Sequence, residues 1–232
     1  MLFGFFWGDW TLLLVLPALV LSVWAQIKVS TTYNQQNIPN RIGLTGAAAA
    51  RRILDANGLS HIRIERVRGH LSDHYDPRAD VIRLSDSVYD VATVAAVGIA
   101  AHEAGHAVQY AQHYGPIKLR AAIVPVTQYS SWLAIPLFLV GLWIASSPLM
   151  MFGILLYATI ALFQLVTLPV EFNASSRALR TLDGARILSG EELKGAKQVL
   201  SAAAMTYVAA LLTSILTLLR LLILAGGNNR RR

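Results

Sequence analysis

The chain has 232 residues, of which 55% are hydrophobic and 14% are charged, a composition on the apolar side of ordinary soluble domains that favours a membrane protein. It contains no cysteine, which excludes thiolate catalysis, disulfide bonds and cysteine-ligated zinc, so any metal ligands must be histidine, aspartate or glutamate. The net charge is +7, but the basic residues are interspersed with acidic ones and form no long basic block, so we expect no nucleic-acid partner.

Three uncharged stretches, residues 10–27, 121–170 and 198–219, are long enough to form membrane helices. A helix rises about 1.5 Å per residue and must cross a hydrocarbon core of about 30 Å, so the fifty-residue middle stretch can hold two crossings. The sequence Ser-Ser-Pro at 146–148 predicts the turn between helices at 127–145 and 149–168. The first stretch lacks the positively charged start of a signal peptide and is longer than the apolar part of one, so we interpret it as a retained membrane anchor. The sequence therefore predicts four transmembrane helices.

The polar segment at residues 26–120 is the only stretch able to form a sizeable extramembrane domain. Thr45 is a suitable N-cap for a helix at 47–56, and Gly58 follows as a stop signal. Residues 61–69 predict a half-buried strand, and residues 71–85 predict a hairpin around the turn-forming sequence Asp-Pro-Arg-Ala-Asp.

The next predicted helix begins at Ser85 or Ser87 and meets no strong breaker before Gly115-Pro116. It carries the sequence AAHEAGHAVQ at residues 100–109. A second polar connection, at 171–197, is expected to join the third and fourth membrane helices.

The sequence AAHEAGHAVQ predicts a zinc site on this helix. Positions four residues apart share a helix face, so the imidazoles of His102 and His106 can bind one Zn²⁺. Glu103 lies beside that face, where a carboxylate can remove a proton from a metal-activated water. The alternative is a chance pattern of surface residues. Because the flanking sequence is uncharged, an unliganded His-Glu-His cluster would be a costly polar insertion, and we favour the metal site.

A catalytic zinc ion usually takes three protein ligands, and two residues are candidates for the third. Glu171 follows the third membrane helix directly. Two crossings separate it from His106, which returns the chain to the same side of the membrane. Asp183 meets the same test and lies in the sequence Leu-Asp-Gly, the third-ligand signature of intramembrane site-2 proteases. It is surrounded by charged residues typical of a surface turn, so we favour Glu171.

The predicted fold is a mainly α-helical membrane protein with a small α+β zincin-like catalytic domain between membrane helices 1 and 2. Its predicted parts follow the chain order: a transmembrane anchor at 1–27, the zinc-peptidase domain at 28–120, membrane helices 2 and 3 at 121–170, the connection with the third ligand at 171–197, and membrane helix 4 with a basic tail at 198–232.

The chain resembles the YugP-like membrane zinc metallopeptidases, small bacterial integral-membrane proteins with a gluzincin-type site. The resemblance rests on five blocks that span nearly the whole chain in the family's order: RIGLTGAAAARRIL, LSDHYDPRADVIRLS, AAHEAGHAVQY, TLPVEFNASSRAL and AAAMTYVAALLTSILTLLRLL. It implies His102, His106 and Glu171 as zinc ligands and Glu103 as the general base. It also implies a multi-pass protein of the bacterial cytoplasmic membrane.

Three further residues have predicted roles at the site. The EFNAS block is similar to a segment of the CAAX-type and heat-shock membrane peptidases, in which an aspartate that can orient a ligand histidine stands where this chain has Ser175. In the YugP-like pattern an aspartate often stands where this chain has Asn173, which can still accept a hydrogen bond. His74 is a candidate to stabilise an oxyanion or line a substrate cleft beside an edge strand, or else to fix a hairpin turn.

The predicted function is hydrolysis of peptide bonds in membrane proteins or peptides near the bilayer surface, with the lipid bilayer as the surrounding partner. Basic residues border the membrane helices mainly on the side of the predicted catalytic domain, which favours a cytoplasmic catalytic face. The arginine run at 230–232 argues for the opposite orientation. Two alternatives are a site-2-type protease that uses Asp183 and a non-catalytic scaffold stapled by zinc. The sequence predicts no oligomeric state.

Overall fold

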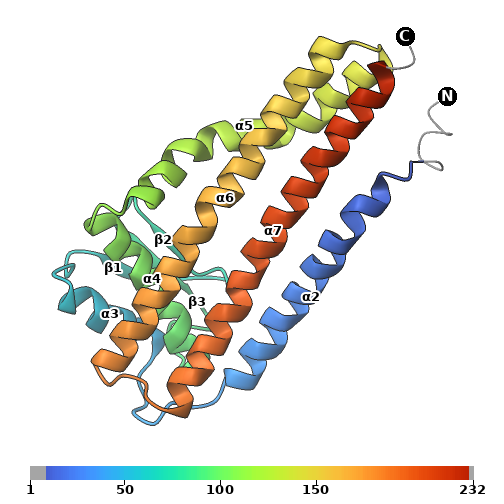
Figure 1. Cartoon of the computed structure of the whole chain (residues 1–232). Helices are drawn as coiled ribbons and strands as arrows, with labels where there is room; N and C mark the ends of the chain where they lie inside the picture. Colours follow the sequence, from blue (N-terminus) through green and yellow to red (C-terminus); the bar gives the residue numbers. More distant parts are fainter. Residues whose placement is uncertain (1–8, 230–232) are drawn as a thin grey trace. The chain divides into compact units, whose positions relative to one another are not determined.

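The computed structural model describes residues 9–229. The first eight residues of the predicted anchor and the predicted basic tail at 230–232 lie outside this range. The chain forms two compact units, and several helices contribute to both. The elements in chain order are α2 (Leu12–Gln36), α3 (Gly46–Ala56), β1 (Arg63–Val67), β2 (His74–Asp76), β3 (Val81–Ser85), α4 (Val94–Ala111), α5 (Gly115–Trp143), α6 (Ser147–Gly184) and α7 (Glu191–Asn229) (Figure 1).

The first unit contains the described part of Met1–Ala25 together with Leu119–Leu168 and Thr206–Arg232 as far as residue 229. Helices α2, α5, α6 and α7 are each long and apolar enough to cross a membrane, as the sequence predicted. The predicted turn between α5 and α6 is confirmed, because α5 ends at Trp143 and α6 begins at Ser147.

Arg220 of α7 is held by polar groups near the start of α2. It donates to Asp9 at 2.6 Å and to Thr11 at 3.2 Å. Asp9 is almost fully buried, so this ion pair joins the beginning of α2 to α7 within the first unit.

The second unit contains Gln26–Lys118 and Pro169–Met205. Its small sheet has the strand order β1-β3-β2, with β1 parallel and β2 antiparallel to β3. The predicted strand and hairpin are thus confirmed. The predicted cap is confirmed as well, because the Thr45 hydroxyl accepts the backbone N–H of Ala48 at the start of α3.

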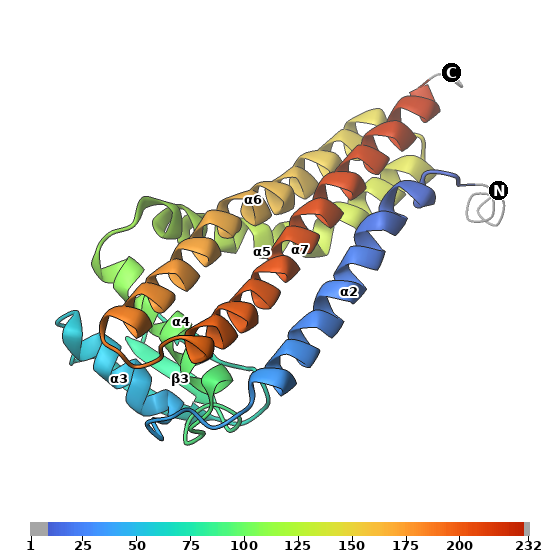
Figure 2. The same cartoon turned by 60° about the horizontal axis from the view of Figure 1, so that its bottom comes forward.

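The core of the second unit lies between α3, α4 and the sheet (Figures 1 and 2). Small side chains on α4 allow α3 to pack closely, and β3 is buried along most of its length. The end of α6, the connection that follows it and the start of α7 complete this core with Ala178, Leu182, Ile187, Leu188, Ala196 and Leu200. Residues 169–205 therefore belong to the same compact unit as the sheet.

The predicted start of α4 is wrong. Ser85 ends β3, and α4 begins at Val94 with Thr93 as its N-cap. Residues between them form turns whose carbonyls accept hydrogen bonds from an earlier part of the chain: Gly46 and Ala47 donate to Val91 and Tyr89. These tertiary bonds hold the segment outside the helix.

The polar connection predicted at 171–197 is mostly helical. Helix α6 continues to Gly184, and α7 begins at Glu191. The connection is therefore the short segment at 185–190, where Arg186 and Gly190 adopt positive φ angles of 52° and 57°. Residues 171–184 therefore lie on a regular helix, which carries the third predicted ligand and packs into the core of the second unit through Ala178 and Leu182.

Candidate metal centre

Two histidines of α4 and one glutamate of α6 form a cluster that could hold a metal ion. His102 and His106 are four residues apart in a regular helix, so both imidazoles leave the same face. Their ring centroids are 4.6 Å apart and the rings are nearly perpendicular. Glu171, two residues after Pro169, is buried beside them.

The spacing of the three side chains fits a zinc ion. Oε2 of Glu171 lies 3.2 Å from Nε2 of His102 and 3.5 Å from Nε2 of His106. Four ligands placed tetrahedrally at about 2.0 Å from zinc are separated by about 3.3 Å. Two imidazoles with one carboxylate are also a donor set found in catalytic zinc sites, in which water completes the coordination. The residues present therefore fit the metal that the sequence predicted.

Asp183, the alternative third ligand, is not part of this cluster. It lies twelve residues after Glu171 on the same unbroken helix, which separates the two backbones by about 18 Å. Its side chain is exposed near the end of α6. Within the described residues, the structure brings Glu171 and not Asp183 to the histidine pair.

Glu103, the predicted general base, is buried next to the cluster and faces strand β2. Its Oε2 accepts the backbone N–H of Tyr75 at 3.0 Å. Tyr75 stands at the middle of β2, the outer strand of the sheet, and its ring packs against Tyr110 of α4 at 5.7 Å. The Tyr75 N–H bonds to Glu103 and not to β3, so it points to the outer edge of β2, where no other described strand pairs.

Gln109 holds His106 in position and was missed by sequence reasoning. Its Nε2 donates to the carbonyl of Val170 at 2.8 Å and to Oδ1 of Asn173 at 2.9 Å. Both amide hydrogens are thereby used, so Oε1 accepts a hydrogen bond from Nδ1 of His106 at 3.0 Å. The proton on Nδ1 leaves a free lone pair on Nε2, the atom that faces Glu171. Gln109 follows His106 by three residues, and that spacing was the available signal.

Ser175 and Asn173 support the cluster from α6. Oγ of Ser175 lies 3.1 Å from Nδ1 of His102, so the serine reaches the histidine that an aspartate would orient in the related peptidases. Asn173 accepts hydrogen bonds from Gln109 and from Nε of Arg177, the latter at 2.7 Å. Each ligand histidine thus has a neutral side chain at its second ring nitrogen.

The charges around His106 favour a cation. Burial lowers the pKa of His106, but the hydrogen bond and charge of Glu171, together with the charge of Glu103, outweigh it and hold that pKa above its ordinary value. The same carboxylates stabilise a metal ion at this point.

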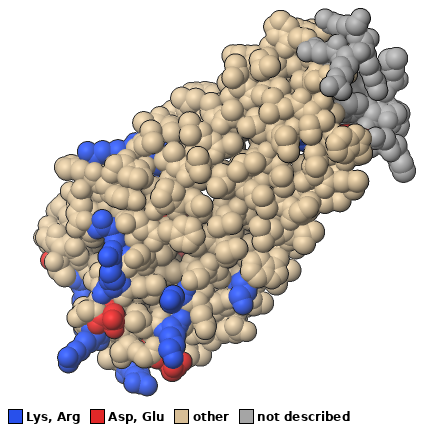
Figure 3. Space-filling model, viewed as in Figure 1, with Lys and Arg blue, Asp and Glu red and all other residues tan. Residues whose placement is uncertain are grey.

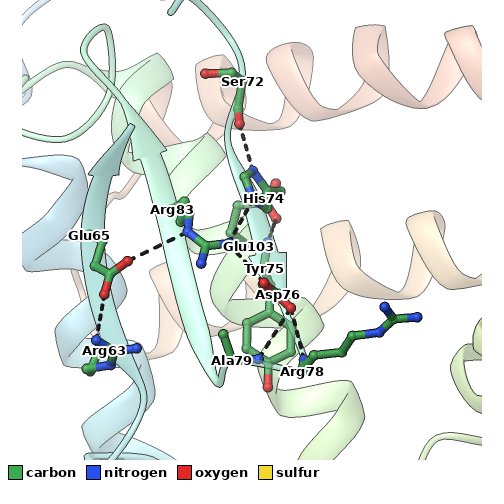
Figure 4. Close-up of polar contacts among 10 residues, drawn as sticks. All are labelled: Arg63, Glu65, Ser72, His74, Tyr75, Asp76, Arg78, Ala79, Arg83 and Glu103. Atoms are coloured by element: carbon green, nitrogen blue, oxygen red, sulfur yellow. Dashed lines mark hydrogen bonds and ion pairs between the residues drawn. The ribbon is translucent and has the colours of Figure 1, made fainter. Parts of the chain in front are cut away.

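The side chain of His74 lies on the face of the sheet opposite to that of Tyr75, which packs against α4. Alternate residues of a strand point to opposite faces, so His74 leaves β2 away from Tyr75. Its Nδ1 is 2.9 Å from the carbonyl of Ser72, and its Nε2 is 3.5 Å from Arg83, which also pairs with Asp76 (Figure 4). The structure does not bring this side chain into the metal cluster, and its catalytic role stays a prediction.

A glycine allows α4 and α6 to approach closely at the cluster. A Cβ atom on Gly105 would lie 2.8 Å from the backbone carbonyl oxygen of Ala174. Gly105 precedes His106, and Ala174 precedes Ser175. The contact between the two backbones therefore sets the distance between the histidine pair and Glu171.

Comparisons with known proteins identify the family of the chain. Residues 11–226 match the model of the family described as "Putative neutral zinc metallopeptidase". The "Putative membrane protease YugP" of Bacillus subtilis (strain 168) is 47% identical over 208 residues, which cover 89% of this chain and 92% of that protein. No solved structure matches the chain.

Proposed function

The chain belongs to the neutral zinc metallopeptidase family, and from this premise we propose that it is a membrane-embedded zinc metalloendopeptidase. The observation that carries the proposal is the convergence of His102, His106 and Glu171 at distances suited to zinc, with the carboxylate of Glu103 beside them. We assign the three clustered residues as zinc ligands and Glu103 as the general base.

The proposed reaction is hydrolysis of a peptide bond. Zinc, when bound, would polarise the scissile carbonyl and acidify the attacking water. Glu103 takes one proton from that water while the water oxygen attacks the carbonyl carbon. It then delivers the proton to the amine nitrogen as the carbon–nitrogen bond breaks. Gln109 and Ser175 hold the two imidazoles with their Nε2 lone pairs directed toward the metal position.

The free edge of β2 supports an extended peptide as the substrate. Tyr75 directs its backbone N–H to this edge, where Glu103 now accepts it. A peptide that pairs with the edge would gain main-chain hydrogen bonds and bring its carbonyl group close to Glu103.

We further propose that the substrates are membrane proteins or membrane-associated peptides cleaved near the bilayer surface. Glu171 follows the apolar stretch ending at Leu168 by three residues along α6. We also propose a multi-pass protein of the bacterial cytoplasmic membrane with a cytoplasmic catalytic face, since the flanking Lys and Arg residues lie mainly in the segments that belong to the second unit.

Zinc content and hydrolysis together test the proposal. The full chain, wild type or with Glu171→Ala, Asp183→Ala or Glu103→Gln, is purified in detergent and its zinc is measured by elemental analysis. We expect about one zinc per chain in all except Glu171→Ala. Hydrolysis of a peptide library, followed by mass spectrometry, should fall by about 100-fold or more in Glu103→Gln.

Two outcomes would contradict the proposal. Zinc that survives Glu171→Ala but is lost in Asp183→Ala would favour the site-2 type of mechanism. Unchanged cellular function in Glu103→Gln, with zinc retained, would favour the non-catalytic scaffold.

A further inference from the structure

A groove of about 590 Å³ lies between the C-terminal part of α6 and the N-terminal part of α7, within the second unit. Its walls are amphipathic. Phe172 and Leu179 of α6 and Leu193 and Leu200 of α7 provide apolar surface. Such a mixture of open apolar surface and polar rim is typical of a surface that binds an amphiphile.

The rim of the groove is positively charged. Arg180, Lys194 and Lys197 line it, against one acidic residue, Asp183. Lys194 pairs with Glu191 at 2.6 Å. The side chains of Arg180 and Lys197 form no ion pair or hydrogen bond with any other residue in the range 9–229. Two cations are therefore available to an anionic ligand.

Basic residues also dominate the surrounding surface. Figure 3 shows Lys and Arg side chains spread over the lower part of this face, around the ends of α6 and α7, with fewer acidic side chains among them. A surface of this kind attracts anions at long range and retains them where apolar contacts are also available.

We propose that this groove binds an anionic phospholipid. The phosphate would lie between Arg180 and Lys197, and the upper part of an acyl chain would lie against Phe172 and Leu179. Along α6, Phe172 follows the apolar stretch ending at Leu168 by about one helical turn, so the apolar end of the groove begins where the membrane-spanning stretch ends, and Arg180 lies about two turns further along the helix. A soluble phosphate would leave the apolar walls uncovered, and an acidic peptide would leave backbone groups without partners there.

The absence of cysteine allows a direct test. Ser201 is exposed and lines the groove, so Ser201→Cys accepts one fluorescent label. The labelled full chain is placed in phosphatidylcholine nanodiscs that contain brominated phosphatidylglycerol or, in equal amount, brominated phosphatidylcholine. We expect stronger quenching by the brominated anionic lipid. Each of Arg180→Gln and Lys197→Gln should lower this preference by about fivefold.

Two matched substitutions control for net charge. Arg52→Gln and Arg68→Gln, made singly like the test variants, each remove one exposed cation of the same unit that does not line the groove, and each should leave the preference unchanged. Equal quenching by the two lipids in the wild type would overturn the proposal, as would an equal loss in the control variants. Displacement of the lipid by inorganic phosphate would assign the site to a free anion, and displacement by an acidic peptide would assign it to a protein ligand. Binding here requires neither zinc nor Glu103, so the result is independent of the proposed catalysis.

Discussion

At the scale of single residues, the least expected feature of the site is that neutral side chains, those of Gln109 and Ser175, contact the Nδ1 atoms of the two histidines. Gln109 is fully buried and links His106 to the backbone of α6 beside Glu171. It therefore connects the ligands of two helices that are distant in sequence. This arrangement fixes the ring orientation without adding another charge to a site that already contains the carboxylates of Glu171 and Glu103.

We predict that Gln109→Leu weakens zinc binding by about 10- to 100-fold, the usual effect of removing a group that orients a ligand. Zinc affinity is measured by competition with a chelator, alongside the melting temperature. Gln112→Leu is the control, because Gln112 is exposed at the end of α4 and bonds to Arg177 instead of a ligand. A lower melting temperature with unchanged zinc affinity would reduce Gln109 to a packing role.

The ionisation of Asp73 makes the stability of the folded protein depend on pH. Burial raises its pKa above the ordinary 3.8, although hydrogen bonds from Ser85 oppose the shift, and the nearby charge of Glu103 raises it further. A raised pKa means that the folded state binds a proton more tightly than the unfolded state. Ionisation of Asp73 therefore costs stability, and the cost develops as the pH rises from 3.8 through the higher folded-state value.

Asp73→Asn should accordingly raise the melting temperature at pH values above this window, and the gain should shrink as the pH approaches 3.8. The amide can still accept the N–H of Ser85. Thermal unfolding of both proteins at several pH values measures the difference, in which the titration of other groups cancels. A variant that is less stable at every pH would show that the hydrogen bonds of the carboxylate outweigh its burial.

At the scale of helices and strands, close packing of α4 on α6 determines whether the site can form. Two small residues, Ala104 and Gly105, stand between Glu103 and His106, and the α6 backbone lies against Gly105. An added methyl group at this point has no flexible neighbour to displace.

We predict that Gly105→Ala separates the two helices, lowers the melting temperature, and weakens zinc binding. A loss of about 1–3 kcal/mol in stability is typical of such overpacking. Gly115→Ala is the matched control, because a Cβ atom there would meet nothing within 4 Å. Equal effects of the two substitutions on zinc affinity would show that the contact with Ala174 does not set the site.

Local signals predicted most elements, and tertiary contacts explain the errors. Thr45 capped the expected helix, and the turn sequence after Asp76 formed the expected hairpin. The start of α4 could not be predicted in the same way. The carbonyls of Tyr89 and Val91 accept hydrogen bonds from the backbone N–H groups of Ala47 and Gly46, about 45 residues earlier, which no local pattern reveals. Gln109 follows His106 by three residues, which is a local signal, but its partners Val170 and Asn173 come from α6 and could not be predicted locally.

At the scale of the whole molecule, the candidate site combines a local motif with the path of the chain. The spacing of His102 and His106 is a property of one helix and was readable directly. Glu171 was admitted as a partner because an even number of membrane crossings separates it from them, and it was preferred to Asp183 because charged residues typical of a surface turn surround Asp183. The crossing argument depends on α5 and α6 being membrane helices, and both meet the length and hydropathy required.

The same reasoning predicts the orientation of the protein. Basic residues flank the membrane helices mainly in segments of the second unit, so the connection between α6 and α7 should be cytoplasmic and the turn between α5 and α6 should be outside. Because the chain has no cysteine, Ser189→Cys and Ser146→Cys each introduce a single thiol in these two connections. In intact cells, a membrane-impermeant maleimide should label the cysteine at 146 only, and permeabilised cells should show labelling at both positions. The reverse pattern would turn the metal cluster to the outer face, as the arginines at 230–232 would favour, and the substrates would then have to be sought among exported proteins.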